Sequence, residues 1–205
     1  PAAPAAGGKV VSAKARKKVV ALGTSTGGPQ SLQKVIPLLP ADLGVPVLIV
    51  QHMPANFTAS LASRLDTLSK VTVVEAQGGE KLQPNYVYIA KGGKQMVIKK
   101  MGNDRIIELR EEDPQLLHNP SVDVMAASVG EAYGSETLGV IMTGMGSDGK
   151  KGLTIVKQKG GFIISQNEAT SIVYGMPKAV VDAGIADEVV PLEEIAARIA
   201  YHTRG

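Results

Sequence analysis

The sequence of 205 residues has no cysteine and no tryptophan, and it has only two phenylalanines. Without cysteine the chain cannot form a disulfide, a thiolate metal site or a cysteine nucleophile. The lack of disulfides suits a reducing compartment, so we expect a cytoplasmic location. Few aromatic rings are available for base stacking, and acidic and basic residues are interspersed at a net charge of only +3. We therefore expect no nucleic-acid partner.

Long apolar runs are also missing. No segment approaches the roughly 20 apolar residues that span a bilayer. Apolar residues still make up 44% of the chain, which is enough for one α/β domain with a buried core. Residues 1–8 contain only proline, alanine and glycine, and residues 9–18 are rich in lysine and arginine. We expect 1–18 to be a linker and 19–205 the folded domain, cut from a longer chain.

Short apolar runs alternate with segments of helical periodicity after residue 18. The predicted strands are 19–22, 47–50, 71–74, 86–89, 138–142, 162–165 and 189–190. The predicted helices are 30–39, 56–68 with Asn56 as cap, 121–132, 148–158, 176–182 and 191–201. This alternation favours a doubly wound α/β fold, a mostly parallel sheet with helices on both faces. Residues 96–109 add an antiparallel hairpin around a Gly-Asn-Asp turn.

Polar residues follow three of these strands directly. Ser25 lies in GTSTGG after the first strand, His52 follows the second, and Asp148 lies in TGMGSDG after the fifth. Ligands of an open parallel sheet bind outside the carboxyl ends of its strands, so we expect these side chains to meet in one crevice. A serine, a histidine and a carboxylate can form a nucleophile, its base and the group that orients the base.

The serine segment fits a nucleophile elbow. Residues 23–27 have the spacing G-x-S-x-G, in which serine occupies a sharp turn and the glycines leave room for it. The backbone N–H groups of Thr26 and Gly27 would lie at a helix N-terminus and could donate to an oxyanion. A phosphate-binding glycine loop is the alternative, although the spacings GxxxxGK[ST] and GxGxxG are absent.

His52 is the best placed of the three histidines. His202 lies near the C-terminus, where we expect fraying, and His118 lies in a polar loop, where we expect it to be solvated and replaceable, with contact to a substrate left open. Asp148 has a second interpretation as the N-cap of the helix that it precedes, and the two roles are compatible. Asp123 is the alternative carboxylate, with a cap or a place on the pocket rim as the simpler interpretation.

Together these segments resemble the catalytic domain of the chemotaxis protein-glutamate methylesterase family. The matching segments are GTSTGGP (23–29), QHMP (51–54), NPSVD (119–123), TGMGSDG (143–149), QNE (166–168) and YGMP (174–177). The resemblance covers about residues 19–199 and implies a single doubly wound α/β domain. It also implies that Ser25 is the nucleophile, His52 the base and Asp148 the orienting acid.

The resemblance further implies an activity and partners. The family hydrolyses methyl esters of glutamate side chains on chemoreceptors and deamidates certain receptor glutamines, without a metal or organic cofactor. Backbone groups near Thr26, Gly27 and Met145 would hold the oxyanion, in a cleft open enough for a receptor. The methylated chemoreceptors would be the only link to the membrane. A phosphorylatable receiver domain usually precedes the catalytic domain, and we expect one to be missing from this chain.

Two other classes of protein stay open on the sequence. An α/β-hydrolase for small esters orders its residues serine, acid, histidine, whereas His52 precedes Asp148 here. A nucleotide-binding module could use the same sheet, but the phosphate-loop lysine and the dinucleotide fingerprint are missing. Labelling of Ser25 by a serine-directed probe separates a hydrolase from such a module.

Overall fold

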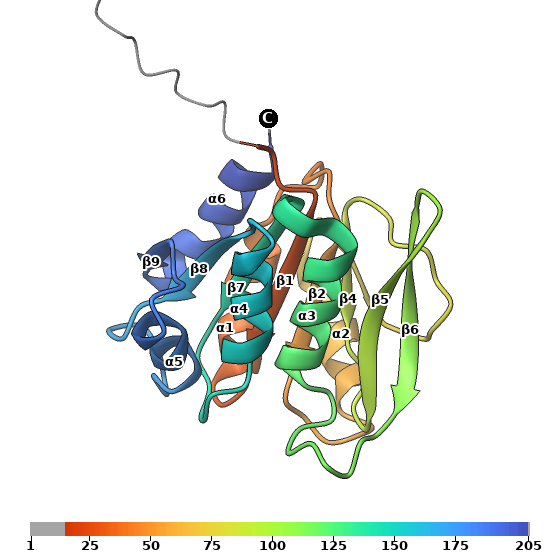
Figure 1. Cartoon of the computed structure of the whole chain (residues 1–205), viewed down its shortest axis with the longest axis horizontal. Helices are drawn as coiled ribbons and strands as arrows, with labels where there is room; N and C mark the ends of the chain where they lie inside the picture. The colour runs from red at the N-terminus through yellow and green to blue at the C-terminus, as the bar shows by residue number, and fades with distance from the viewer. Residues whose placement is uncertain (1–14, 205) are drawn as a thin grey trace, which may run out of the picture.

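The computed structural model describes residues 15–204, which form a central sheet, helices on both of its faces and a separate hairpin (Figure 1). Seven parallel strands lie in the order β3-β4-β2-β1-β7-β8-β9. They are β1 (Val19–Thr24), β2 (Val47–Gln51), β3 (Thr72–Glu75), β4 (Tyr86–Ile89), β7 (Thr137–Ile141), β8 (Phe162–Gln166) and β9 (Glu188–Val190). The predicted doubly wound α/β class is confirmed.

β1 lies at the centre of the sheet, between β2 and β7. Every residue of these three strands is buried, because helices cover both faces of the sheet. This is why the strands read as nearly continuous apolar runs instead of alternating ones. Gly23 pairs with Val50 and with Ile141, so the three strands end at nearly the same level. The strand order reverses at β1 and β7, which is where such folds bind ligands.

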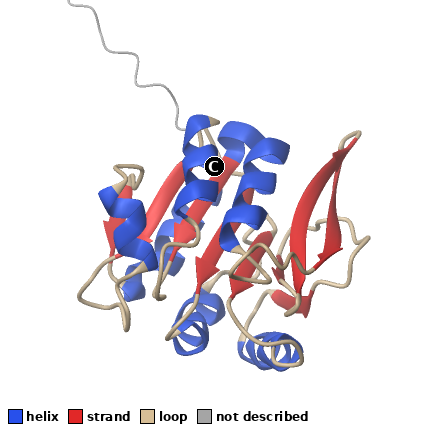
Figure 2. Ribbon diagram, turned by 60° about the horizontal axis from the view of Figure 1, so that its bottom comes forward, coloured by secondary structure: helices blue, strands red, loops and turns tan. Residues whose placement is uncertain are grey.

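The helices divide between the two faces of the sheet (Figure 2). They are α1 (Gly28–Val35), η1 (Ile36–Leu38), α2 (Thr58–Leu68), α3 (Val122–Tyr133), η2 (Gly134–Glu136), α4 (Lys150–Gln158), α5 (Met176–Asp182) and α6 (Leu192–Thr203). Leu32, Leu61 and Ile195 place α1, α2 and α6 in one hydrophobic cluster. α3, α4 and α5 share the other cluster. Among the described residues, no helix combines the length and the apolar character needed to cross a membrane.

The hairpin forms its own two-stranded sheet. β5 (Lys94–Met101) and β6 (Asp104–Glu111) are antiparallel and are longer than the sequence predicts. They do not join the main sheet but pack beside α3, where Met96, Ile98 and Ile107 enter the same cluster as Met125. The hairpin therefore supports α3 from the side, and α3 is the helix whose start reaches the candidate site.

Two predicted helix caps are wrong. Asn56 does not cap α2, because its backbone is left-handed (φ 76°) and the helix begins two residues later at Thr58. Asp148 does not cap the helix that follows it, because α4 begins at Lys150 and Gly149 occupies the cap position with a φ of 104°. Because the Asp148 side chain does not bind the start of α4, its carboxylate can accept hydrogen bonds from another element.

Residues 16–18 contact the folded domain, although the sequence places them in the linker. The N–H groups of Lys17 and Lys18 donate to the carbonyl oxygens of His202 and Glu136, and Arg16 Nε donates to Thr203 O. His202, expected to lie in a frayed end, is buried in α6. The first 14 residues of the predicted linker lie outside the described residues.

We predict that Gly152→Ala destabilises the domain. Gly152 lies near the start of α4, where a Cβ would lie 2.4 Å from Asp123 O and 2.7 Å from Asp123 Cα. Both atoms are backbone, so α3 or α4 must shift, and overpacking of this kind costs about 1–3 kcal/mol. Urea unfolding measures the loss. Lys151→Ala, at the exposed neighbouring position, is the control, and equal stability of the two variants would contradict the close contact.

Candidate active site

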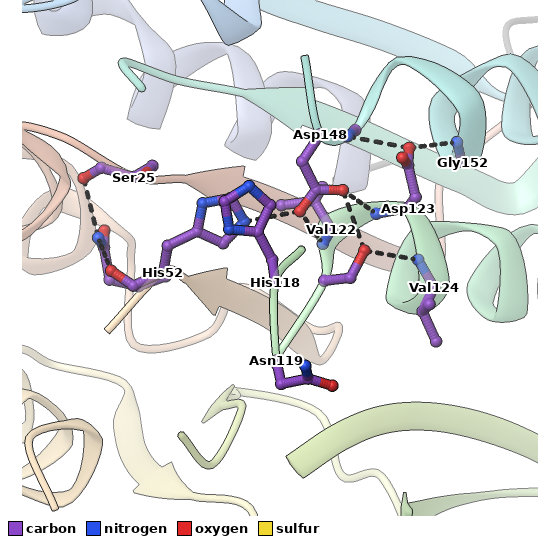
Figure 3. Close-up of polar contacts among 12 residues, drawn as sticks. Ser25, His52, His118, Asn119, Val122, Asp123, Val124, Asp148 and Gly152 are labelled. Carbon is purple, nitrogen blue, oxygen red and sulfur yellow. Dashed lines mark hydrogen bonds and ion pairs between the residues drawn. The ribbon is translucent and has the colours of Figure 1, made fainter. Parts of the chain in front are cut away.

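The structure brings Ser25, His52 and Asp148 to one edge of the sheet (Figure 3). Ser25 follows β1 directly, His52 follows β2, and Asp148 lies in the turn between β7 and α4. Because these strands are neighbours that end at the same level, residues far apart in the sequence become close in space. The arrangement that the sequence predicts at the strand ends is present.

A short hydrogen bond joins His52 to Asp148. Nε2 of the imidazole lies 2.6 Å from Oδ2 of the carboxylate, and the two side chains are only 9% and 5% exposed. An ionised carboxylate only accepts, so Nε2 carries the proton and Nδ1 is the basic nitrogen. Nδ1 is buried and has no hydrogen-bond partner among the described residues. The more familiar triad arrangement places Nδ1 against the acid, so the ring is reversed here.

Asp148 is also held by the start of α3. Its Oδ1 accepts from Ser121 Oγ at 3.0 Å and from Asp123 N–H at 2.8 Å. Its Oδ2 accepts from Val122 N–H at 2.7 Å. The first N–H groups of a helix have no partner inside it, and Ser121 is the N-cap of α3. Asp148 therefore caps α3 and orients His52 with the same carboxylate.

Asp123 makes the reciprocal contact, from the start of α3 to the start of α4. Its Oδ1 accepts from the N–H groups of Gly149 and Gly152 at 2.9 and 2.8 Å, at the start of α4. Each aspartate thus binds the start of the helix next to the other aspartate (Figure 3). A cap is what the sequence favours for Asp123, although the helix that it caps is α4. Within residues 15–204, no hydrogen bond joins Asp123 to the His52 ring, so Asp148 is the carboxylate bonded to His52.

The surroundings shift the two carboxyl pKa values in opposite directions. Burial raises the pKa of Asp148, but hydrogen bonds from the His52 ring and from the N–H groups of Asp123 and Val122 outweigh it and lower the pKa from 3.8 to about 2. The pKa of Asp123 is raised, first by burial and also by the charge of Asp148, against hydrogen bonds from Gly152 and Gly149. Asp148 is therefore the carboxyl that stays ionised beside His52.

The turn that carries Ser25 is fixed by Thr143, just after β7. Thr143 O accepts from Ser25 N–H at 2.9 Å and from Thr24 Oγ1 at 2.7 Å. Thr143 Oγ1 donates to Thr26 O at 3.0 Å. The backbone on both sides of the serine is thus tied to the strand that leads to Asp148.

Gln51 ties the serine turn to the histidine turn. Its buried Nε2 donates to Ser25 O at 2.8 Å and to His52 O at 3.1 Å. The amide lies so close to α1 that a Cβ on Gly28 would be 1.7 Å from its Oε1. Ser25 Oγ forms no hydrogen bond within the part of the chain that is described. Such bonds often tighten only when the substrate is bound.

Three backbone N–H groups around Ser25 have no acceptor among residues 15–204, those of Thr26, Gly27 and Met145. Thr26 and Gly27 form the turn into α1, and Gly27 has a φ of 81°. Met145 follows Gly144, where a Cβ would lie only 2.9 Å from Ser25 Cβ. The groups predicted as oxyanion donors are therefore close to the serine and available, and their role stays a prediction.

His118 is half-buried and contacts the site, whereas the sequence suggests a solvated side chain. Its ring stacks on the His52 ring, with 3.8 Å between centroids and 7° between planes (Figure 3). The pKa of His118 is lowered, first by burial and then by charge on His52, while Asp148 raises it. No local sequence pattern indicates this contact, because His52 and His118 lie far apart in the sequence.

A sequence model described as CheB methylesterase matches residues 20–199. The chain belongs to the CheB methylesterase family. A protein-glutamate methylesterase/protein-glutamine glutaminase of Nitratidesulfovibrio vulgaris is 49% identical over 183 residues, which are 89% of this chain and 50% of that protein. The corresponding protein of Desulfitobacterium hafniense is 50% identical over 183 residues, 89% of this chain and 47% of that protein.

The comparison with solved structures agrees with the family. The crystal structure of the Thermotoga maritima CheB methylesterase catalytic domain matches with a TM-score of 0.88 at 42% identity, over 91% of this chain and 99% of that one. The chain therefore spans about half the length of the curated CheB relatives and has the fold of the solved catalytic domain.

Two shallow hollows flank the His52–Asp148 pair of this CheB domain. One of about 440 Å³ lies against Asp148, and one of about 280 Å³ lies against His52. Leu117 and His118 line both hollows, and Ser25 lines neither. Leu117, which lines both hollows, is 89% exposed. Near the serine turn, Met145 and Ile172 are 65% and 56% exposed. The edge of the sheet thus presents an open, partly apolar surface.

We predict that Asp148→Asn loses about 3 kcal/mol of stability at pH 7, the scale of losing a hydrogen bond to a buried charged group and leaving its donor unpaired. The amide has one acceptor oxygen, and its NH2 group would face a donor of α3 or His52. The folded pKa of Asp148 is lowered, so its ionised form stabilises the fold above about pH 4. This stability is lost as the pH falls towards about 2.

Urea unfolding at several pH values checks this prediction. The difference between wild type and Asp148→Asn should be largest at neutral pH and should shrink below pH 4. Glu112→Gln, which removes an exposed carboxylate, should follow the wild type throughout. A constant difference at every pH would contradict the role of the ionised carboxylate.

Proposed function

We propose that this domain is a serine hydrolase that removes methyl groups from esterified glutamate side chains of chemoreceptors. The observation that carries the proposal is the His52–Asp148 pair, in which Nε2 is bonded to the acid and the buried Nδ1 has no partner among the described residues. The names of relatives about half identical to this chain, protein-glutamate methylesterase/protein-glutamine glutaminase, support the substrate.

The first half of the proposed reaction forms an acyl-enzyme. Nδ1 of His52 takes the proton of Ser25 Oγ as this oxygen bonds to the ester carbonyl carbon. The carbonyl oxygen becomes an oxyanion and accepts hydrogen bonds from the N–H groups of Thr26, Gly27 and Met145. The imidazolium returns its proton to the methoxy oxygen, the carbon–oxygen bond breaks, and methanol leaves. Asp148 stays ionised and stabilises the imidazolium.

The second half restores the enzyme. Nδ1 takes a proton from water as the water oxygen bonds to the acyl carbon, and the proton then passes to Ser25 Oγ when the serine leaves. The product is a glutamate side chain. With a glutamine side chain the same steps release ammonia in place of methanol, which is the second activity in the relatives' names.

The proposal extends to partners and location. We propose that residues 19–205 act as a catalytic domain that residues 1–18 join to a receiver domain, in the cytoplasm, with receptors as the only link to the membrane. The relatives are about twice as long as the matched region, which leaves room for such a domain. The exposed Leu117, Met145 and Ile172 supply a surface that it could cover until phosphorylation releases it.

We predict that Ser25→Ala reduces methanol release from methylated receptor by at least about 10⁴-fold, because the covalent route is lost. His52→Gln should be reduced to a similar degree, since the two residues act as one unit. Ser60→Ala, an exposed serine on α2, should turn over like the wild type. Near-normal methanol release by folded Ser25→Ala would remove the case for a serine hydrolase.

A further inference from the structure

The proposed mechanism leaves His118 without a task, although its ring covers the proposed base. The two imidazole planes are nearly parallel, 7° apart, with centroids 3.8 Å apart. Neither ring nitrogen of His118 forms a hydrogen bond within residues 15–204. Its contact with the site is therefore the face of the ring, and this excludes a role as a second base bonded to Ser25 in the free enzyme.

The loop that carries His118 is held by hydrogen bonds from the side chain of Gln95. This buried side chain of β5 donates from Nε2 to His118 O at 2.8 Å and to Asn119 Oδ1 at 2.6 Å, and its Oε1 accepts from Ser121 N–H at 2.9 Å. Asn119 Oδ1 also accepts from Asp113 N–H, across the loop. The backbone on both sides of His118 is thus held in place, next to the helix start that binds Asp148.

His52 needs such a neighbour because it has a single side-chain hydrogen bond. The bond from Nε2 to Asp148 fixes one atom of the ring but leaves the ring able to tilt about that bond. A flat ring stacked on one face restricts this tilt and keeps water off that face. A neutral stacked ring also favours the imidazolium that forms during the reaction, since its face is negative. The lowered pKa of His118 favours its neutral form.

We propose that His118 is a positioning residue, whose stacked ring holds the His52 imidazole at the angle at which Nδ1 meets the proton of Ser25 Oγ. The inference rests on the proposed function of Ser25 and His52. It reverses the expectation from the sequence that His118 is replaceable. It assigns His118 no contact with the reacting atoms.

The experiment compares three replacements of His118. His118→Ala removes the ring, His118→Leu fills the volume without a flat ring, and His118→Phe keeps the stack without a titrating nitrogen. We expect the kcat of methanol release to fall about 10- to 100-fold in the first two, the scale of a small misplacement of a catalytic group, with KM little changed. His118→Phe should recover most of the kcat. Gln115→Ala, exposed in the same loop, is the control.

The rate at which a fluorophosphonate labels Ser25 gives a readout that does not depend on the natural substrate. It should fall in the Ala and Leu variants and recover in the Phe variant, in parallel with kcat. Unchanged labelling in His118→Ala would overturn the inference, and so would a Phe variant as slow as the Ala variant. If the wild type is labelled quickly but releases no methanol, the proposed substrate is wrong while the labelling series still tests His118.

Discussion

The carboxylate of Asp148 is the acceptor on which both the local fold and the proposed chemistry depend. It accepts from the His52 ring, from the cap Ser121 and from the first N–H groups of α3. A buried carboxyl tends to take up a proton, but these donors and the positive end of the helix favour its ionised form. The negative charge of Asp148 thus holds the start of α3 in place, and the same charge would stabilise an imidazolium on His52.

The two aspartates hold the site and the helix starts together. Asp123 fixes the start of α4 in the same way as Asp148 fixes α3, so the two helices and the turn after β7 form one unit. Ser25 belongs to the same unit through Thr143, which binds the serine turn from the end of β7. The proposed nucleophile, base and acid therefore depend on three adjacent strand ends instead of on mobile loops.

Much of this arrangement could be predicted from the sequence because its signals are local. Ser25 and His52 each follow an apolar strand directly, and parallel strands bring such positions to one edge. The true partner of Asp148 could not be predicted, because capping rules compare residues a few positions apart, whereas Asp148 binds an N–H group 26 positions earlier. The stack of His118 on His52 is equally non-local. The sequence predicts that Lys17 is a solvated linker residue. In the structure its Nζ donates to Ser135 O and its side chain is buried.

The position of the proton on His52 most directly tests the proposed roles of Ser25, His52 and Asp148. Long-range ¹H–¹⁵N correlation spectra distinguish the two neutral tautomers of each of the three histidines, and the His52→Gln variant assigns the signal of His52. We expect the neutral His52 ring to carry its proton on Nε2, bonded to Asp148, with Nδ1 unprotonated. A His52 ring protonated on Nδ1 and free on Nε2 would contradict this expectation, because no basic nitrogen would then be available to Ser25.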